Sequence, residues 1–395
     1  MSNKPTVAAA VSGTKLIHGD AAHVTEDVAP AITVSTTFKT PRDTGTITNG
    51  FDPSNPTRHV YSRYTQENST RAEKILSSVI GGHAITYSSG LAASFAALVH
   101  YKPRCIAITK GYHGCHLTIQ TYKKARHVKI INIDDDFEEG TLCWLETPLN
   151  PKGEARNIRF YADKVHAARG HLLVDSTFAP PPLQYPFKWG ADIIMHSGTK
   201  YFGGHSDLLC GILAVKTISQ WKELWTDRTY SGNMMGSLEA WLLLRSLRTF
   251  HLRIPRQSQT ATALARWLDR VSQAAPGEEF EGVPGGVVEK VWHSSLQAET
   301  ADWDVAKQME GGWNATFSFL VSKKEHAAIL PHLVKYFVPA TSLGGVESLI
   351  EHRMTSDPTS DPRLVRVSVG VEELEDLQAD LRQAFKRISQ EKTKL

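Results

Sequence analysis

Short runs of β-branched and aliphatic residues alternate with amphipathic stretches along residues 61–250. Six of these runs end in polar residues or are directly followed by one: AITYSS, RCIAITK, VKIINI, LCWLET, HLLVDST and DIIMHS. Runs of this length predict β-strands, and strands that alternate with helices predict βαβ units. The pattern therefore predicts an α/β fold with a mostly parallel central sheet and helices on both faces.

Two segments of different character flank this predicted large domain. Residues 1–60 are rich in Thr, Pro, Gly and Asn and lack periodicity, which predicts an irregular N-terminal arm. Residues 251–395 contain the helical stretch QTATALARWLDRVSQ and the strand-like runs NATFSFLV and PRLVRVSVG, which predict a smaller α+β domain. Its final helix is marked by apolar residues spaced three and four apart, namely Leu374, Leu377, Leu381, Phe385 and Ile388.

Composition narrows the class of protein. The chain has 395 residues, 41% hydrophobic and 22% charged, with a net charge of +3, and its densest basic cluster, YKKARH, is short. We therefore expect no nucleic-acid partner. No segment approaches about 18 continuous apolar residues, and the N-terminus lacks a signal-peptide core, so we expect neither membrane spanning nor secretion, with the cytoplasm as the default location. The four cysteines are too widely spaced for a disulfide framework or a zinc ribbon.

The stretch ADIIMHSGTKYFGGHSD places Lys200 just after a predicted strand, with the hydroxyls of Ser197 and Thr199 beside it. A lysine is usually a solvated surface residue. At the carboxyl end of a sheet strand, however, it lies where α/β proteins bind ligands. A lysine amine condenses with aldehydes, and pyridoxal 5'-phosphate (PLP) combines an aldehyde with a phosphate that hydroxyls can bind. The stretch therefore suggests a PLP site.

Such a site needs further groups elsewhere in the chain. Asp175 closes the strand HLLVDST and could keep the ring nitrogen of the cofactor protonated, although it could also cap a helix. Ser89, Gly90 and Leu91 begin an Ala-rich helix whose N-terminus could bind the phosphate, or could be an ordinary cap. Tyr112 lies in a Gly-flanked loop and could stack on the ring, or could be a buried loop residue.

Fewer residues bear on substrate binding and on the two alternative kinds of site, a metal site and a dinucleotide site. In PRLVRVSVG, Arg366 alternates with valines and could bind an amino-acid carboxylate through its fork, unless it is a solvated strand residue. His113 and Cys115 lie close together, but no HExxH or paired CxxC spacing is present, so we expect no metal site. No strand runs into GxGxxG, so a dinucleotide site is also disfavoured.

Six motifs occur in an order that resembles the Cys/Met-metabolism family of fold-type I PLP enzymes, which includes cystathionine γ-synthase, cystathionine lyases, methionine γ-lyase and O-acetylhomoserine sulfhydrylase. The motifs are VYSRY, YSSGLAA, ETPLNPKG, VDSTFAPPPLQYPFKWGADIIMHSGTKYFGGHSD, SLGGVESLIEH and VRVSVGVEELEDLQADL, and the resemblance covers residues 14–385. It implies a fold-type I PLP-dependent transferase fold. It also implies that Lys200 bonds to the cofactor, that Asp175 pairs with the ring nitrogen and that Tyr112 stacks on the ring.

The same resemblance implies the remaining contacts and the assembly. Tyr61 and Arg63 would reach the phosphate site of a neighbouring subunit, so each site would be shared within a homodimer, with a tetramer of two dimers expected. The phosphate would be bound by Ser89, Gly90, Leu91, Ser197 and Thr199, and the substrate by Asn150, Thr341, Ser342 and Arg366.

One departure from the family bears on the reaction. Thr341 stands where family members that handle cystathionine tend to carry a glutamate, so it offers no counter-charge to a distal ammonium group. We therefore expect γ-replacement on an O-acyl-L-homoserine such as O-acetyl-L-homoserine, with sulfide, a thiol or a carbon nucleophile as co-substrate, as in some fungal secondary-metabolism members. Lys200 and Tyr112 would transfer the protons. The alternative is a lyase that releases a 2-oxo acid and ammonia; a catalytically silent scaffold or a nicotinamide oxidoreductase is less favoured.

Overall fold

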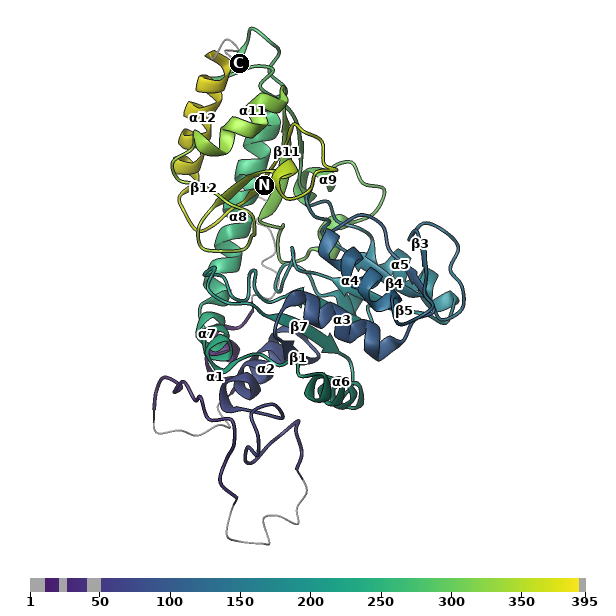
Figure 1. Cartoon of the computed structure of the whole chain (residues 1–395). Helices are drawn as coiled ribbons and strands as arrows, with labels where there is room; N and C mark the ends of the chain where they lie inside the picture. The colour runs from purple at the N-terminus through teal and green to yellow at the C-terminus, as the bar shows by residue number, and fades with distance from the viewer. Residues whose placement is uncertain (1–10, 21–26, 41–50, 391–395) are drawn as a thin grey trace, which may run out of the picture.

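The computed structural model describes residues 11–20, 27–40 and 51–390. Its largest sheet has seven strands in the order β1-β7-β6-β5-β4-β2-β3 (Figure 1). β7 runs antiparallel to β1 and β6, and the other pairs are parallel. The six predicted strands are confirmed as β1 to β6, whereas β7 was not predicted. The strands are β1 (His83–Tyr87), β2 (Cys105–Ala107), β3 (Lys129–Ile131), β4 (Leu142–Glu146), β5 (His171–Asp175), β6 (Ile193–Ser197) and β7 (Gly211–Val215).

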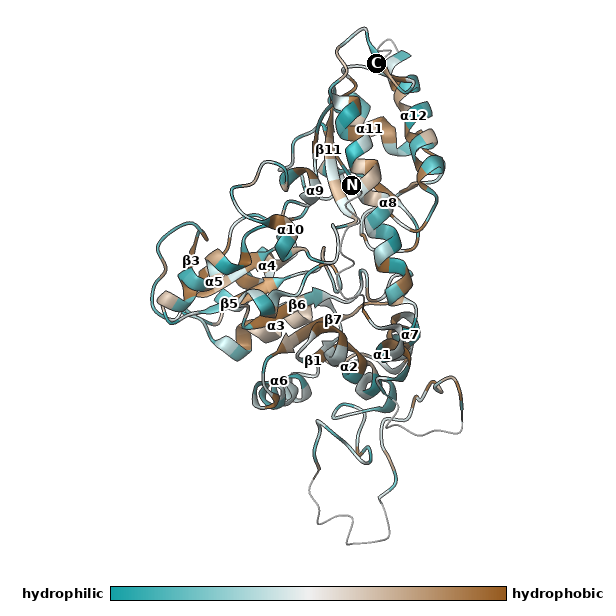
Figure 2. Ribbon diagram, turned by 180° about the vertical axis from the view of Figure 1, so that it is seen from behind, coloured by the Kyte–Doolittle hydropathy of each residue, from teal (hydrophilic) through white to brown (hydrophobic). Residues whose placement is uncertain are grey.

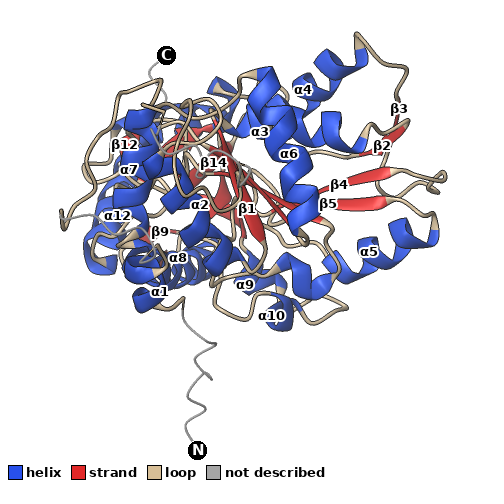
Figure 3. Ribbon diagram, turned by 90° about the horizontal axis from the view of Figure 1, so that it is seen from below, coloured by secondary structure: helices blue, strands red, loops and turns tan. Residues whose placement is uncertain are grey.

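Helices cover both faces of this sheet (Figure 3). Every residue of β4 and β7 is buried, and Figure 2 shows hydrophobic colouring along β1 and β7. A sheet covered on both faces needs apolar side chains on both, which explains why its strands read as continuous apolar runs. In the view of Figure 3, α3, α4 and α6 lie on one side of the strands and α5 on the other. The helices of this region are α2 (Glu67–Ile80), α3 (Gly90–Tyr101), α4 (His113–Lys123), α5 (Ile158–Ala167), α6 (Ile218–Ser231) and α7 (Ser237–Leu247).

A second sheet of five strands lies in the C-terminal third, in the order β10-β11-β14-β13-β12 (Figure 1). It is antiparallel except for the β12–β13 pair. The fold is therefore the predicted fold-type I arrangement of a large, mostly parallel sheet with a smaller C-terminal sheet. The strands are β10 (Val288–Trp292), β11 (Thr316–Val321), β12 (Val338–Pro339), β13 (Leu349–His352) and β14 (Leu364–Ser368), with a separate pair, β8 (Glu279–Phe280) and β9 (Val283–Pro284).

The helices of the C-terminal third agree with the sequence pattern. α8 contains the predicted helical stretch but begins earlier, at Phe250. α12 buries Leu377, Leu381, Phe385 and Ile388, which confirms its predicted apolar stripe, while Lys386 and Arg387 are exposed and Asp380 is buried with the stripe. The helices are α8 (Phe250–Ser272), α9 (Ser294–Gln297), α10 (Val305–Gln308), α11 (Lys324–Ile329) and α12 (Leu374–Gln390).

The described part of the first 60 residues contains one short helix, α1 (Gly13–His18), and extended chain. Val28 is 98% exposed and Val34 is 81% exposed, so this extended chain has no core of its own. The rest of the predicted arm, residues 1–10, 21–26 and 41–50, lies outside the described residues. The domain boundaries near residues 60 and 250 stay predictions. Among the described residues, no helix is long and apolar enough to cross a membrane.

Candidate active site

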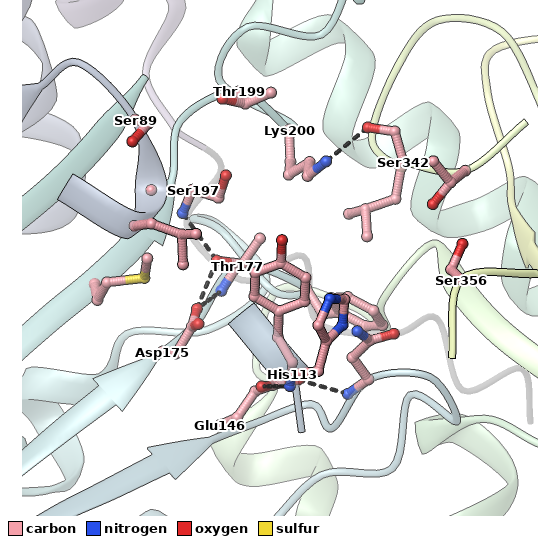
Figure 4. Close-up of a pocket in the computed structure, with 18 of the residues that line it drawn as sticks. Ser89, His113, Glu146, Asp175, Thr177, Ser197, Thr199, Lys200, Ser342 and Ser356 are labelled. Atoms are coloured by element: carbon pink, nitrogen blue, oxygen red, sulfur yellow. Dashed lines mark hydrogen bonds between the residues drawn. The ribbon is translucent and has the colours of Figure 1, made fainter. Parts of the chain in front are cut away.

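A cavity of about 430 Å³ opens beyond the carboxyl ends of β4, β5 and β6, the edge of the sheet where the sequence predicted the chemistry. Figure 4 shows Glu146 and Asp175 at the ends of neighbouring strands, with Lys200 and Ser342 across the cavity from them. Every predicted site residue except Tyr61 and Arg63 lines this cavity: Ser89, Gly90, Leu91, Tyr112, Asn150, Asp175, Ser197, Thr199, Lys200, Thr341, Ser342 and Arg366.

Two buried carboxylates stand side by side at the strand ends. Asp175 is 4% exposed, and its Oδ1 accepts hydrogen bonds from the backbone N (3.0 Å) and the Oγ1 (2.5 Å) of Thr177. Glu146 pairs with Asp175 in the register of β4 and β5. Burial raises the pKa of both carboxyl groups, and the charge of Asp175 raises that of Glu146 further. A cation beside this pair would offset the free-energy cost of burying two negative charges. The Oδ2 of Asp175 could accept a hydrogen bond from such a cation.

Glu146 also positions two loops. Its Oε2 accepts a hydrogen bond from the backbone N of Tyr112, and its Oε1 accepts one from the backbone N of Asn150, both at 2.7 Å (Figure 4). Tyr112 is 41% exposed and lines the cavity, so the alternative of a buried loop tyrosine is wrong. Glu146 was missed in the sequence, although it closes a predicted strand just as Asp175 does.

The N-terminus of α3 forms a cradle with β6. Ser89 is the N-cap of this helix, and its side chain accepts a hydrogen bond from the backbone N of Ala92 at 3.1 Å. A Cβ at Gly90 would lie 3.0 Å from the Oγ of Ser197, so only a glycine leaves this space open. Ser89 is therefore a cap, and Gly90 and Leu91 of the first turn line the cavity, where helix N-terminal N–H groups can bind an anion. Thr199 lines the same wall, with its hydroxyl bonded to the backbone of Cys210.

Lys200 points across the cavity to the C-terminal third of the chain. Its Nζ donates a 2.6 Å hydrogen bond to the Oγ of Ser342 (Figure 4). Burial lowers the pKa of the amine from 10.5 to about 8, and the positive charge of Arg366 adds to the effect. Lys200 is therefore not a solvated surface lysine, and a useful fraction of its amine is neutral near neutral pH.

Arg366 is held on the same side of the cavity as Ser342. It is 4% exposed, so the alternative of a solvated strand arginine is wrong. Its Nη1 donates to the Oδ1 of Asn150 at 3.0 Å, and its Nη2 donates to the backbone O of Ser342 at 3.1 Å. Its Nη2 also forms a 2.6 Å ion pair with Glu351, its cross-strand neighbour on β13. The guanidinium is thus fixed in one orientation, as recognition of a planar carboxylate requires.

Several residues of this site were not predicted from the sequence. Thr177, Arg353 and Ser356 line the cavity, and Glu351 lies behind it. Tyr61 and Arg63 do not line it; the Nη1 of Arg63 donates to the backbone O of Thr229 at 3.2 Å. Their role in a neighbouring subunit stays a prediction.

Comparison with known proteins agrees with the geometry. The family model of Cys/Met metabolism PLP-dependent enzymes matches residues 13–386. The chain belongs to this family. It is 30% identical to the cystathionine gamma-lyase of Dictyostelium discoideum over 94% of its own length and 97% of that protein. It is also 30% identical to the cystathionine beta-lyase of Lactococcus lactis subsp. cremoris strain MG1363, with 95% and 98% covered.

Solved structures give the same family. A methionine gamma lyase from Micromonospora echinospora superposes with a TM-score of 0.81 at 28% identity, covering 94% of this chain and 98% of that one. The protein is therefore a PLP-dependent enzyme of Cys/Met metabolism, as the motifs predicted. PLP, when bound, supplies an aldehyde that condenses with amines and a protonated ring that withdraws electrons from the bonds at Cα. The cavity fits this cofactor, because it combines an anion cradle, a buried carboxylate for the ring nitrogen and a partly neutral lysine amine.

Proposed function

We propose that the protein is a lyase that eliminates the substituent from the β- or γ-carbon of an L-amino acid and releases a 2-oxo acid and ammonia. The observation that carries the proposal is the position of the Lys200 amine, which faces the buried Asp175 across one cavity and is held beside the substrate-side residues Ser342 and Arg366. Relatives that span nearly the whole chain are named as lyases, which supports elimination over the γ-replacement expected from the sequence.

Different residues of the cavity would have different roles in such an elimination. Arg366 and Asn150 bind the α-carboxylate and so orient the bonds at Cα. Asp175 keeps the ring nitrogen of the cofactor charged, and the cradle formed by the first turn of α3 binds its phosphate. Lys200, with a pKa of about 8, can accept the Cα proton and return a proton to the departing group. Tyr112 stands beside this path as a stacking ring and a second proton carrier.

γ-Replacement on an O-acyl-L-homoserine remains the second candidate, and Thr341 is the observation that favours it. The side chain of Thr341 lines the cavity, where its Oγ1 lies 3.5 Å from the Nη2 of Arg366. A hydroxyl at this position cannot neutralise the ammonium group at the far end of cystathionine. An acceptor without an ammonium group, such as sulfide or an enolate, needs no such partner.

Product analysis separates the two reactions. L-Cystathionine, L-methionine and O-acetyl-L-homoserine would each be incubated with the holoenzyme, first alone and then with sulfide, cysteine or acetoacetate, and the products identified by mass spectrometry. A 2-oxo acid formed without an acceptor supports the lyase. A new amino acid formed only with one acceptor supports replacement and identifies the nucleophile. Lys200→Ala should abolish both outcomes, whereas Lys216→Ala, outside the cavity, should not; turnover by Lys200→Ala would contradict the assignment.

We further propose that each active site is shared within a homodimer, with Tyr61 and Arg63 completing the partner's phosphate site. The test is complementation between Lys200→Ala and Arg63→Ala subunits, each inactive alone. A mixed dimer would contain one site with both residues intact, so random mixing should restore about a quarter of the wild-type activity. Mixtures that stay inactive, with dimers shown to exchange, would contradict sharing.

A further inference from the structure

A second arginine, Arg353, lines the cavity beside Arg366. It lies in the short 3-10 turn Arg353–Thr355 that follows β13, and it is 3% exposed. The Nη1 of Arg353 and the Nη2 of Arg366 both contact the same oxygen of Glu351, the Oε2, at 3.4 Å and 2.6 Å. The two guanidinium groups therefore share one carboxylate, and Arg366 has the closer contact.

The two guanidinium groups differ in how many of their donors are used. Arg366 is bound by Asn150, Ser342 and Glu351. Within the described part of the chain, the side chain of Arg353 has one hydrogen bond, the 3.4 Å contact to Glu351, and its Nε is buried without a partner. A buried guanidinium with idle donors carries a desolvation cost that a bound anion would remove.

The charges of this wall leave room for such an anion. Lys200, Arg353 and Arg366 are cationic side chains of the cavity. Among the described residues, Glu351 is the one carboxylate within ion-pair distance of the two arginines, and Arg353 is also near enough to Asp357 to help lower the pKa of that carboxyl group. The carboxylates at the ends of β4 and β5 lie on the wall that the proposed function gives to the cofactor. An α-carboxylate bound at Arg366 would balance the excess charge of the Arg366 and Arg353 pair on Glu351, and Arg353 would keep only its 3.4 Å contact to Glu351.

Arg353 also lies near enough to Tyr112, the predicted stacking residue, for its charge to act on the phenol. Burial raises the pKa of the Tyr112 phenol, and the positive charge of Arg353 opposes this rise. Ser356, which also lines the cavity, hydrogen-bonds through its Oγ to the second oxygen of Glu351. The 3-10 turn after β13, with its C-cap Ser356, thus brings a charged group and a hydroxyl group into the cavity at one place.

We propose that Arg353 anchors a second carboxylate subsite, so that the group leaving from or entering at the side chain of the amino-acid substrate itself carries a carboxylate. This inference rests on the proposed function, because it takes the α-carboxylate to be bound at Arg366. It gives the far end of the substrate a recognition element that Thr341 does not provide. The protein should therefore prefer amino acids with a distal carboxylate to methionine, and oxo-acid acceptors to sulfide.

The test uses two unreactive amino acids that differ only at the far end. L-2-Aminoadipate carries a carboxylate where L-norleucine carries a methyl group, and neither has a leaving group. The dissociation constant of each would be measured on the holoenzyme from the spectral change of the cofactor. We expect L-2-aminoadipate to bind about tenfold more tightly, as one charge-assisted hydrogen-bonded pair would give. Equal affinities for wild-type protein would overturn the proposal without any variant being needed.

Variants then assign the preference to the residue. Arg353→Gln should abolish the preference while leaving the affinity for L-norleucine within about twofold, and Arg353→Lys should retain part of it. Arg363→Gln is the matched control, because Arg363 lies in the same connection and pairs with Asp361 and Glu289 outside the cavity. If Arg353→Gln weakens both ligands equally, Arg353 binds the α-carboxylate and the second subsite is refuted. The binding assay does not depend on turnover. A protein that lacks lyase activity but still binds L-2-aminoadipate more tightly than L-norleucine would therefore refute the lyase proposal and support the second subsite.

Discussion

The lowered pKa of Lys200 can be tested through the pH dependence of its reaction with PLP in the cofactor-free protein. Only the neutral amine attacks the aldehyde. With a pKa lowered from 10.5 to about 8, roughly a quarter of the amine is neutral at a pH of about 7.5, against roughly one molecule in a thousand for an unperturbed lysine. Because the charged form is lost as the pH rises through the pKa, the capture rate should rise up to a pH of about 8 and then level off.

The assay is a pulse of PLP at each pH, followed by borohydride reduction and quantification of the labelled Lys200 peptide by mass spectrometry. Nα-Acetyl-lysine amide, treated in the same way, reports the pH dependence of an exposed amine and of the cofactor itself. Ser342→Ala removes the hydroxyl that accepts from Nζ and should slow capture without moving the midpoint far, because burial is the main cause of the shift. A midpoint at or above about 10 in the wild-type protein would refute the argument that burial makes this amine reactive.

Four substitutions test other parts of the structure. Arg228→Met leaves Glu73 buried without its ion pair and should lower the free energy of unfolding by about 3–5 kcal/mol in a denaturant titration; a loss near zero would contradict the importance of this pair. Gly90→Ala places a Cβ 3.0 Å from a cavity hydroxyl and should weaken PLP binding about tenfold, with the melting temperature of the cofactor-free protein unchanged. Asp175→Asn should retain PLP but lower kcat about a hundredfold or more, and unchanged kcat would exclude its role at the ring nitrogen. Arg366→Lys should raise KM about tenfold or more through loss of the fork, measurable by steady-state kinetics.

The parts of the site that could be predicted are those that a local pattern marks. Asp175 closes an apolar strand, and the carboxyl ends of parallel strands meet at one edge of a sheet, so its location follows from the pattern alone. Lys200 follows the next strand, and the same rule would have found Glu146. Arg366 was proposed from its alternation with valines and then by resemblance, but its pairing with Glu351 across the strands is something that no sequence spacing shows.

Two features, strand β7 and the position of Arg353, could be identified only from the tertiary structure. β7 has five residues, GILAV, without alternation, and its neighbours in the sheet are β1 and β6, one of which lies more than a hundred residues earlier. Arg353 lies in a 3-10 turn and belongs to none of the expected strands or helices. Its place in the cavity follows from the pairing of β13 with β14, which sets Glu351 opposite Arg366, so that Arg353 just after β13 contacts the same carboxylate.

The cavity is lined by two distant parts of the chain: residues 89–209, to which we assign the cofactor contacts, and residues 341–366, to which we assign most of the substrate contacts. This separation has an evolutionary consequence. After a gene duplication, changes confined to the later segment can alter which amino acid is accepted, while the residues assigned to the cofactor in the earlier segment stay unchanged. New substrate preferences can therefore arise without an inactive intermediate, and residues 340–363, between β12 and β14, are where divergence between paralogues should first be sought.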